Sequence, residues 1–293
     1  MNITSITRFT SCLILILLVG HNSYGVGKNS LDVLSETVIV TSLPGDKPGQ
    51  YIYWRGAGFN LCPRCFAIDP NDGTFYIPEV DTKDNIRVHK FDKTGKFIDM
   101  LKLESQAEMI TNIAVDFNGD IYLECYILPN IGGSCLSRFD KNGKWLNSFG
   151  PRGPITAEDI NKAAILSPEN ESYRGKFLRS GSEFFSIVDG YLEFMQTDSS
   201  DTSSFSRIDD RTGKVLGKES TIPLHVKQIM TDKKVKNEVI WENHHSQKRI
   251  EGIVCSVIDR NGEFYYMSVS PDILKVWKVN FRMNRNSGAV EKL

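Results

Sequence analysis

A two-part motif recurs along this chain, and its repetition limits the folds that the chain can adopt. Each copy begins with an Asp- and Gly-containing turn that leads into a short, mostly aromatic strand, and a second apolar strand follows. The clearest copies are residues 68–97 and 115–145, and weaker copies are residues 188–215 and 258–280. Self-similarity of this kind indicates one supersecondary unit used several times, not four unrelated segments.

The interval inside each copy hardly varies. The turn glycine precedes the apolar residue of the second strand by 17 to 20 residues (Gly73 and Phe91, Gly119 and Phe139, Gly190 and Ile208, Gly262 and Val279). The distance between copies is less regular, since Phe91 and Phe139 are 48 residues apart whereas Ile208 and Val279 are 71 apart. Each unit is therefore a fixed hairpin that carries insertions of variable length.

Further short strands flank each hairpin. An apolar segment precedes it at residues 65–68, 112–115, 184–187 and 254–257. A fourth strand follows the first two copies, at residues 97–101 and 145–149. Aromatic and β-branched residues in these segments suit a pleated, half-buried surface. Four consecutive short antiparallel strands per repeat are typical of a β-propeller blade.

The motif also resembles a known family. The pairing of Asp-x-x-Gly-x-Ile-Tyr (residues 116–122) with a later Arg-Phe-Asp-Lys-x-Gly-Lys (residues 138–144) resembles the NHL-type repeat, and more loosely the six-bladed propellers of secreted bacterial proteins. The resemblance spans residues 62–101, 111–149, 183–218 and 252–281. It implies an all-β propeller of four-stranded antiparallel blades. We predict six blades, with five blades or an irregular ring as the alternative.

The segments between the copies are harder to interpret. Residues 36–41 read as a strand, and in propellers an N-terminal strand often joins the final blade. Residues 150–182 and 219–251 are insertions or degenerate blades. In the first, Thr156 and Asp159 form a capping-box-like start of a short helix. In the second, residues 226–241 read as a hairpin.

The N-terminus resembles a secretory leader. Arg8 precedes the apolar run 12–19, which is too short to span a bilayer, and Ser23-Tyr24-Gly25 supplies small residues at the cleavage positions. We predict a signal peptide over residues 1–25 and a single propeller domain over residues 26–293, with an uncleaved anchor as the alternative. The protein is then secreted or periplasmic, with no stable membrane span after cleavage. A net charge of −1 provides no electrostatic footprint for nucleic acid.

Two pairs of cysteines are candidates for a disulfide. A hairpin centred on Asn130 places Cys125 and Cys135 opposite each other, which fits either a cross-strand bridge or two reduced packing thiols. Cys62 and Cys65 are the alternative pair. Their Cys-x-x-Cys lacks the histidine of a haem attachment site and the second ligand pair of a zinc site, so we interpret it as a structural loop.

Other polar residues fit ordinary structural roles. His89 is expected at the surface of an alternating strand, and His244 and His245 in a solvated loop. The Asp-rich segments 69–73 and 81–85 carry oxygen ligands that suit calcium, but the same residues build tight turns, which is the reading we prefer. We therefore predict no catalytic residue, no metal ligand and no cofactor, with calcium as the alternative.

These observations predict a non-catalytic propeller that binds a protein, a glycan or a small ligand outside the cytoplasm. The alternative is a metal-dependent propeller enzyme of the lactonase or lyase type, with a cation in the central channel. None of the site motifs of such enzymes can be matched to residues of this chain. A fold does not by itself supply a function.

Overall fold

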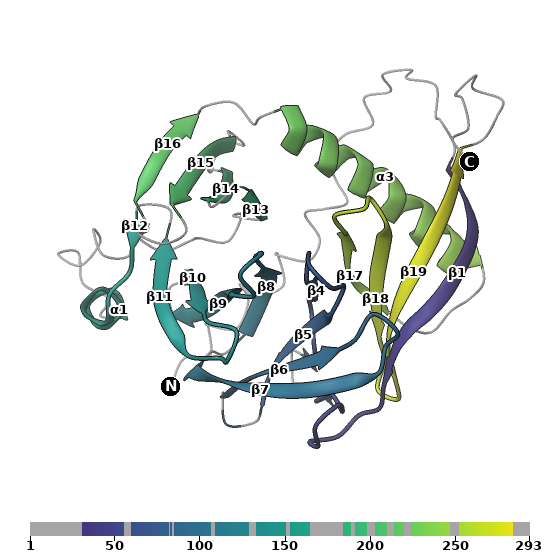
Figure 1. Cartoon of the computed structure of the whole chain (residues 1–293), viewed down its shortest axis with the longest axis horizontal. Helices are drawn as coiled ribbons and strands as arrows, with labels where there is room; N and C mark the ends of the chain where they lie inside the picture. The colour runs from purple at the N-terminus through teal and green to yellow at the C-terminus, as the bar shows by residue number, and fades with distance from the viewer. Residues whose placement is uncertain are drawn as a thin grey trace, which may run out of the picture. The chain divides into compact units, whose positions relative to one another are not determined.

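Each copy of the repeat folds into one antiparallel sheet whose strands follow one another along the chain (Figure 1). In this computed structural model, the strands of the first sheet, in hydrogen-bonded order, are β4 (Ala67–Ile68), β5 (Phe75–Val80), β6 (Asn85–Phe91) and β7 (Phe97–Gln106). Phe75 pairs with Phe91 across β5 and β6. The two strands of the motif are therefore direct neighbours, as predicted.

The other copies form sheets in the same way. The second sheet contains β8 (Met109–Val115), β9 (Ile121–Leu128), β10 (Gly133–Phe139) and β11 (Trp145–Gly150), with the short β12 (Gly153–Pro154) beside β11. The third contains β13 (Phe184–Val188), β14 (Tyr191–Thr197), β15 (Ser203–Asp209) and β16 (Val215–Glu219). The last contains β17 (Gly252–Ile258), β18 (Phe264–Val269) and β19 (Leu274–Met283).

The N-terminal strand completes the last sheet. β1 (Leu31–Ser42) lies next to β19, so the order is β1, β19, β18, β17. This confirms the predicted strand at residues 36–41 and its place in the final sheet. A separate small hairpin is formed by β2 (Trp54–Arg55) and β3 (Asn60–Leu61). The first and last described strands of the chain, β1 and β19, are thus hydrogen-bonded to each other.

The structure describes residues 31–55, 60–81, 83, 85–106, 109–128, 133–150, 153–164, 184–188, 191–197, 203–209, 214–219, 224–246 and 252–283. All of them except Met283 belong to one unit, Leu31–Arg282. The predicted leader, residues 1–25, lies outside the described residues. The described chain is mostly β, with several four-stranded antiparallel sheets, which is consistent with a propeller. The number of blades stays a prediction.

Apolar clusters join neighbouring sheets. In one cluster, Val88 and Leu103 of the first sheet pack with Ile113 and Ile121 of the second. In another, residues of the first sheet pack with residues of the last sheet, among them Phe75, Phe91, Met267 and Val276. Burial of these side chains contributes roughly 1.5–3 kcal/mol each, so face-to-face packing of sheets is a large part of what holds this fold.

The predicted hairpin at residues 226–241 is wrong, because residues Leu224–Ser246 form one helix, α3. The segment contains neither glycine nor proline, and Asp232-Lys233-Lys234 lacks the glycine that usually follows Asp or Asn in a tight hairpin turn. Its Lys, Glu, Gln and Met residues favour a helix. Asp232 and Lys236 form an i,i+4 ion pair of 2.8 Å along it.

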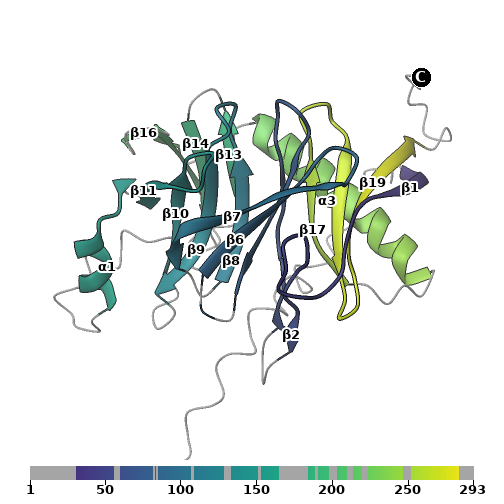
Figure 2. The ribbon, with the colours of Figure 1, turned by 60° about the horizontal axis from the view of Figure 1, so that its bottom comes forward.

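Helix α3 covers one face of the last sheet (Figures 1 and 2). Ile240 of the helix is 1% exposed and packs with Phe264 and Tyr266 of β18. Their neighbour Met267 points to the opposite face, where it packs against the first sheet, since successive strand residues alternate sides. The last sheet is therefore held between the first sheet and α3.

The short helix predicted after Thr156 is confirmed as α1 (Ala157–Ala164). The Thr156 Oγ1 accepts a hydrogen bond of 3.2 Å from the Asp159 backbone N–H, and Asp159 Oδ2 accepts one of 2.9 Å from the Thr156 N–H. This reciprocal pair is a capping box with Asp in the position usually held by Glu.

Candidate functional site

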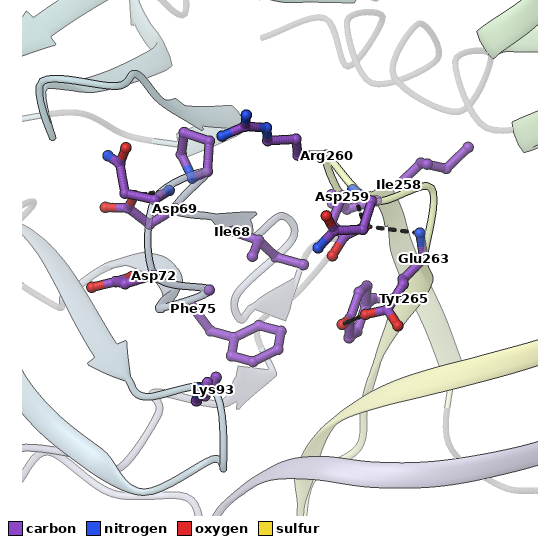
Figure 3. A pocket seen from close by; sticks show the side chains of 15 residues that line it. Ile68, Asp69, Asp72, Phe75, Lys93, Ile258, Asp259, Arg260, Glu263 and Tyr265 are labelled. Atoms are coloured by element: carbon purple, nitrogen blue, oxygen red, sulfur yellow. Dashed lines mark hydrogen bonds between the residues drawn. The ribbon is translucent and has the colours of Figure 1, made fainter.

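A cavity of about 340 Å³ opens between two of the repeated turns (Figure 3). One turn, residues 69–73, precedes β5 of the first sheet, and the other, residues 259–262, precedes β18 of the last sheet. Apolar and aromatic side chains contribute to its lining, namely Ile68, Phe75, Val257, Ile258 and Tyr265. The Phe75 and Tyr265 rings meet edge to face, with centroids 5.6 Å apart. The cavity thus lies at the edge of the apolar cluster that joins the two sheets.

The aspartates of these turns use their carboxylates to hold the turns. Asp69 Oδ1 accepts a 2.8 Å hydrogen bond from the Asn71 N–H, and Asp72 Oδ1 accepts one of 2.8 Å from the Thr74 N–H. Asp259 Oδ1 accepts two, from the Asn261 and Glu263 N–H groups, at 2.9 and 2.8 Å. These contacts confirm that segment 69–73 is a turn built by its aspartates.

At the other end of β5, Asp81 also uses its carboxylate to hold a turn. Asp81 Oδ1 accepts hydrogen bonds from the backbone N–H groups of Lys83 and Asn85, at 2.8 and 3.0 Å. Burial opposes ionisation of Asp81, but hydrogen bonds from the Asn85 side chain and then from these two N–H groups hold the Asp81 pKa below its usual value. Within the described residues, no group of three or more His, Cys, Asp or Glu side chains is arranged to hold a metal ion.

Some polar groups of the residues that line the cavity take no part in the hydrogen bonds of the turns. Within the described part of the chain, the second carboxylate oxygens of Asp72 and Asp259 have no hydrogen-bond partner, and the Lys93 amine has none either. Lys93 comes from the β6–β7 turn, where its Cβ lies 3.4 Å from a Cβ built on Gly73. The cavity therefore presents both unused acceptors and an unused cation.

A third turn contributes to the rim. The Arg260 guanidinium lies 5.5 Å from the centre of the Phe117 ring, in a cation–π contact. Asn71 Nδ2 donates a 3.1 Å hydrogen bond to the Phe117 carbonyl oxygen. Phe117 belongs to the turn before β9 and is 57% exposed. Equivalent turns from three sheets thus meet beside the cavity.

Two further lining residues of the cavity, Tyr265 and Glu263, are hydrogen-bonded to each other. The Tyr265 hydroxyl donates a 2.8 Å hydrogen bond to Glu263 Oε2, and Lys278 forms an ion pair with Glu263. The hydrogen bond from Lys278 is the largest cause that lowers the Glu263 pKa. Burial is the largest cause that raises the Tyr265 pKa. At neutral pH the carboxylate therefore stays ionised and the phenol stays protonated.

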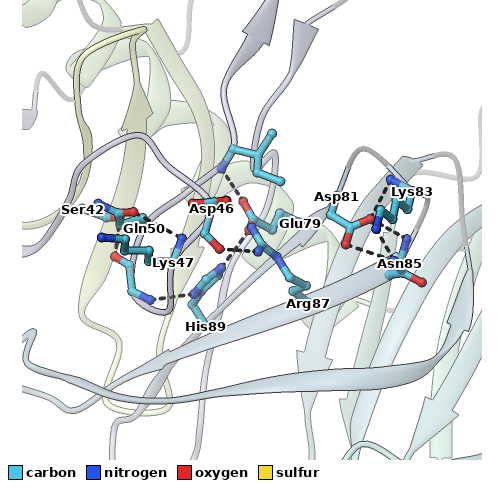
Figure 4. Close-up of polar contacts among 12 residues, drawn as sticks. Ser42, Asp46, Lys47, Gln50, Glu79, Asp81, Lys83, Asn85, Arg87 and His89 are labelled. Atoms are coloured by element: carbon cyan, nitrogen blue, oxygen red, sulfur yellow. Dashed lines mark hydrogen bonds and ion pairs between the residues drawn. The ribbon is translucent and has the colours of Figure 1, made fainter.

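The surface position predicted for His89 is wrong, because His89 is 2% exposed (Figure 4). It lies on β6 beside Arg87 and faces Glu79 of β5, whose carboxylate pairs with both. The Gly49 N–H donates to His89 Nδ1 at 3.2 Å, so Nδ1 is an acceptor and the proton of the neutral ring is on Nε2, 2.8 Å from Glu79 Oε1. Alternation along β6 fails as a guide here because a loop covers this face.

That loop, residues 43–53, is anchored by the buried charges. The Ile52 N–H donates to Glu79 Oε2 at 2.7 Å, and Arg87 donates to the Asp46 carbonyl oxygen at 2.8 Å. The Tyr51 hydroxyl donates to the Ser270 carbonyl oxygen in the last sheet, at 2.5 Å. The cluster of Glu79, Arg87 and His89 is therefore a structural device that fixes the loop between two sheets, at the strand ends opposite the cavity.

Cys125 and Cys135 are direct partners in the β9–β10 register, as predicted from the hairpin. Both thiols are buried, as is that of Cys65, whereas Cys62 is half-buried, and none of the four forms a disulfide in this structure. Burial raises the pKa of the Cys135 thiol to about 11. A disulfide in either pair stays a prediction. His244 and His245 lie in α3, not in a loop, and their side chains are outside the described part of the chain.

Glu124 on β9 is a buried carboxyl group apart from the cavity. It is 8% exposed and accepts a 3.2 Å hydrogen bond from Ser134 Oγ. Burial raises its pKa to about 7, from an ordinary value of 4.5. The native state therefore binds a proton more tightly than the unfolded chain does. Stability from this group is present below about pH 4.5 and is lost as the pH rises through about 7.

Replacing Glu124 by glutamine should remove this pH dependence. We expect the wild-type protein to lose about 3 kcal/mol more of its free energy of unfolding than Glu124→Gln does between pH 4 and pH 8. Urea denaturation at several pH values measures the difference. Glu158→Gln, at an exposed site in α1, is the control and should follow the wild type. Equal losses in Glu124→Gln and wild type would contradict the assignment.

The repeated four-stranded sheets and the cavity between their turns define a propeller-like β protein. No protein-family model matches the chain, and no curated protein matches it in sequence. The NHL-type assignment therefore depends on the motif resemblance. Sequence reasoning found the turns but did not single out Lys93, Phe117 or Arg260, although all three occupy turn positions of the repeat. No helix among the described residues combines the length and the apolar character needed to cross a membrane.

Several solved structures are similar to the chain at low identity. A protein of unknown function from Bacteroides caccae is 11% identical over 71% of this chain and 58% of that chain, with a TM-score of 0.35. A gluconolactonase from Xanthomonas campestris is 12% identical over 78% and 60%, with a TM-score of 0.33. A lignostilbene dioxygenase from Pseudomonas brassicacearum is 9% identical over 61% and 46%, with a TM-score of 0.31. The chain thus matches less than two thirds of the length of each, and these similarities assign no activity to it.

Proposed function

We propose that this chain is an exported, six-bladed NHL-type propeller that binds a small polar ligand and does not transform it. The observation that carries the proposal is the cavity between the turns at residues 69–73 and 259–262. Small-molecule sites are concave, with apolar walls and a few convergent polar groups, and have volumes of about 300–1,000 Å³. At about 340 Å³, this cavity suits a small ligand or one end of a larger one.

The chemistry of the lining favours binding over catalysis. A general acid or base works best when its pKa lies near the working pH. The shifts of Glu263 and Tyr265 move both groups away from neutral pH. One carboxylate oxygen of Asp69 and one of Asp259 accept hydrogen bonds from backbone N–H groups of their own turns. The lining is thus built to offer hydrogen bonds, and the leader-like residues 1–25 support a place outside the cytoplasm.

Ligand-observed NMR tests the proposal. The purified protein would be screened against small metabolites that include sugars, amino acids and carboxylic acids. We expect at least one class to bind, to be weakened by Lys93→Ala and to be recovered chemically unchanged. Lys141→Ala is the matched control, because Lys141 is the repeat equivalent of Lys93, at an exposed position of the β10–β11 turn that does not line the cavity.

Two outcomes would overturn the proposal. One is turnover of the bound compound together with a near-stoichiometric metal ion that survives dialysis, which would indicate the metal-dependent enzyme. The other is binding that Lys93→Ala and Lys141→Ala weaken equally, because the ligand would then not occupy this cavity.

A further inference from the structure

The polar groups that remain unused at the cavity have a mixed character. Asp72 and Asp259 each offer a carboxylate oxygen as an acceptor, whereas Lys93 offers up to three N–H donors. Figure 3 shows Asp72 and Asp259 on turns from different sheets, on the two sides of the cavity. A ligand that filled the space would therefore meet acceptors from both sheets and a donor from the β6–β7 turn.

The charges at the cavity do not favour a strongly ionic ligand. Three aspartates and Glu263 line it, together with Lys93 and Arg260. Lys278 neutralises Glu263, and the Arg260 guanidinium is placed over the Phe117 ring. An anion would face the remaining aspartates, and a cation would face the two basic residues, so either would meet like charges in the lining. A neutral ligand avoids both costs.

A hydroxyl group matches this lining better than other neutral groups do. Each hydroxyl is at once a donor and an acceptor, so it can donate to a carboxylate oxygen and accept from an ammonium group. Hydrogen bonds to charged groups are stronger than those between neutral groups. The Phe75 and Tyr265 rings, which are buried and meet edge to face, close the apolar end of the cavity.

We infer that the ligand of this cavity is a neutral carbohydrate, bound through its hydroxyl groups by Asp72, Asp259 and Lys93. The inference rests on the proposed function, because it specifies the ligand class of the same cavity. The site lies between the turns that follow the first strands of two sheets. It uses the turns of the repeat as its binding elements, in the way that loops on a rigid scaffold commonly carry binding residues.

Isothermal titration with neutral monosaccharides and disaccharides, matched uronic acids and free amino acids tests the inference. We expect at least one neutral sugar to bind more tightly than its uronic acid counterpart. Asp72→Asn keeps an acceptor for the Thr74 N–H while replacing the free carboxylate oxygen with an amide. This variant and Lys93→Ala should each weaken sugar binding about ten-fold, which corresponds to about 1.4 kcal/mol. Lys141→Ala should stay within about two-fold of the wild type.

The outcomes separate the two proposals. If amino acids or uronic acids bind in the cavity and neutral sugars do not, the carbohydrate inference is overturned and the small-ligand function stands. If a compound binds but Asp72→Asn, Lys93→Ala and Lys141→Ala leave it unchanged, the cavity is not the site and both are overturned. Thermal unfolding of each variant shows whether it is folded, so a loss of binding by a misfolded variant is recognised.

Discussion

Replacing Glu79 by alanine is expected to lower the free energy of unfolding by about 3–5 kcal/mol. Glu79 is 3% exposed and is the shared partner of Arg87 and His89. Without it, the Arg87 guanidinium, which is 6% exposed, loses the carboxylate with which it forms its ion pair. The Ile52 N–H of the anchored loop also loses its acceptor. A buried charge left without its partner is among the most destabilising single changes in a protein.

Chemical denaturation of Glu79→Ala and of Glu158→Ala measures this effect. Glu158 forms an exposed i,i+4 pair with Lys162 in α1, and such pairs contribute about 0.3–0.5 kcal/mol. Both variants replace a glutamate by alanine, so the difference between their losses in free energy of unfolding measures the effect of burial and of the ion-pair partners at Glu79. A loss for Glu79→Ala as small as that for Glu158→Ala would show that the cluster does not hold the loop between the sheets.

Replacing Gly95 by alanine should cost about 2–5 kcal/mol. Gly95 closes the β6–β7 turn with a φ of +85°, and a left-handed conformation costs a non-glycine residue about 1–2 kcal/mol. A Cβ at this position would also lie 1.7 Å from the Ile39 carbonyl oxygen of β1. Because that neighbour is backbone, the turn or the strand must shift, which adds about 1–3 kcal/mol. The turn glycine of one sheet thus permits close approach of another sheet's edge strand.

Gly262→Ala is the matched control. Gly262 has a similar φ of +78°, but a Cβ there meets nothing within 4 Å. We expect about 1–2 kcal/mol for this variant, from the backbone conformation alone. Thermal or urea unfolding of both variants separates the cost of the turn from the cost of the contact between sheets. Equal losses would mean that β1 does not lie against the β6–β7 turn in solution.

The repeat allowed much of the local structure to be predicted from residues alone. Alternating apolar and aromatic residues between Asp-Gly turns specify strand, turn and pairing over short distances, so the hairpin of Phe75 and Phe91 and the register of Cys125 and Cys135 followed from spacing. The capping box at Thr156 was readable for the same reason, since both of its partners lie within one helical turn.

The error at His89 fell where a distant segment decides the outcome. His89 alternates like a surface residue, but the loop at residues 43–53 covers it. The segment 226–241 has apolar pieces that resemble a hairpin. It is a helix because the sequence has no turn glycine and because Ile240 finds an apolar face on the last sheet. The loop over His89 leaves no mark in the sequence of β6, whereas the lack of glycine in segment 226–241 was readable from that segment itself.

The candidate site shows the same division. The amino-acid sequence by itself determined the turns, because an aspartate binds backbone N–H groups only a few residues away. Only the tertiary structure decided that the turns of residues 69–73 and 259–262, nearly two hundred positions apart, enclose one cavity and meet Phe117 of a third turn. Contacts between sheets depend on how whole apolar faces pack, and that packing is a property of the folded chain rather than of any one repeat.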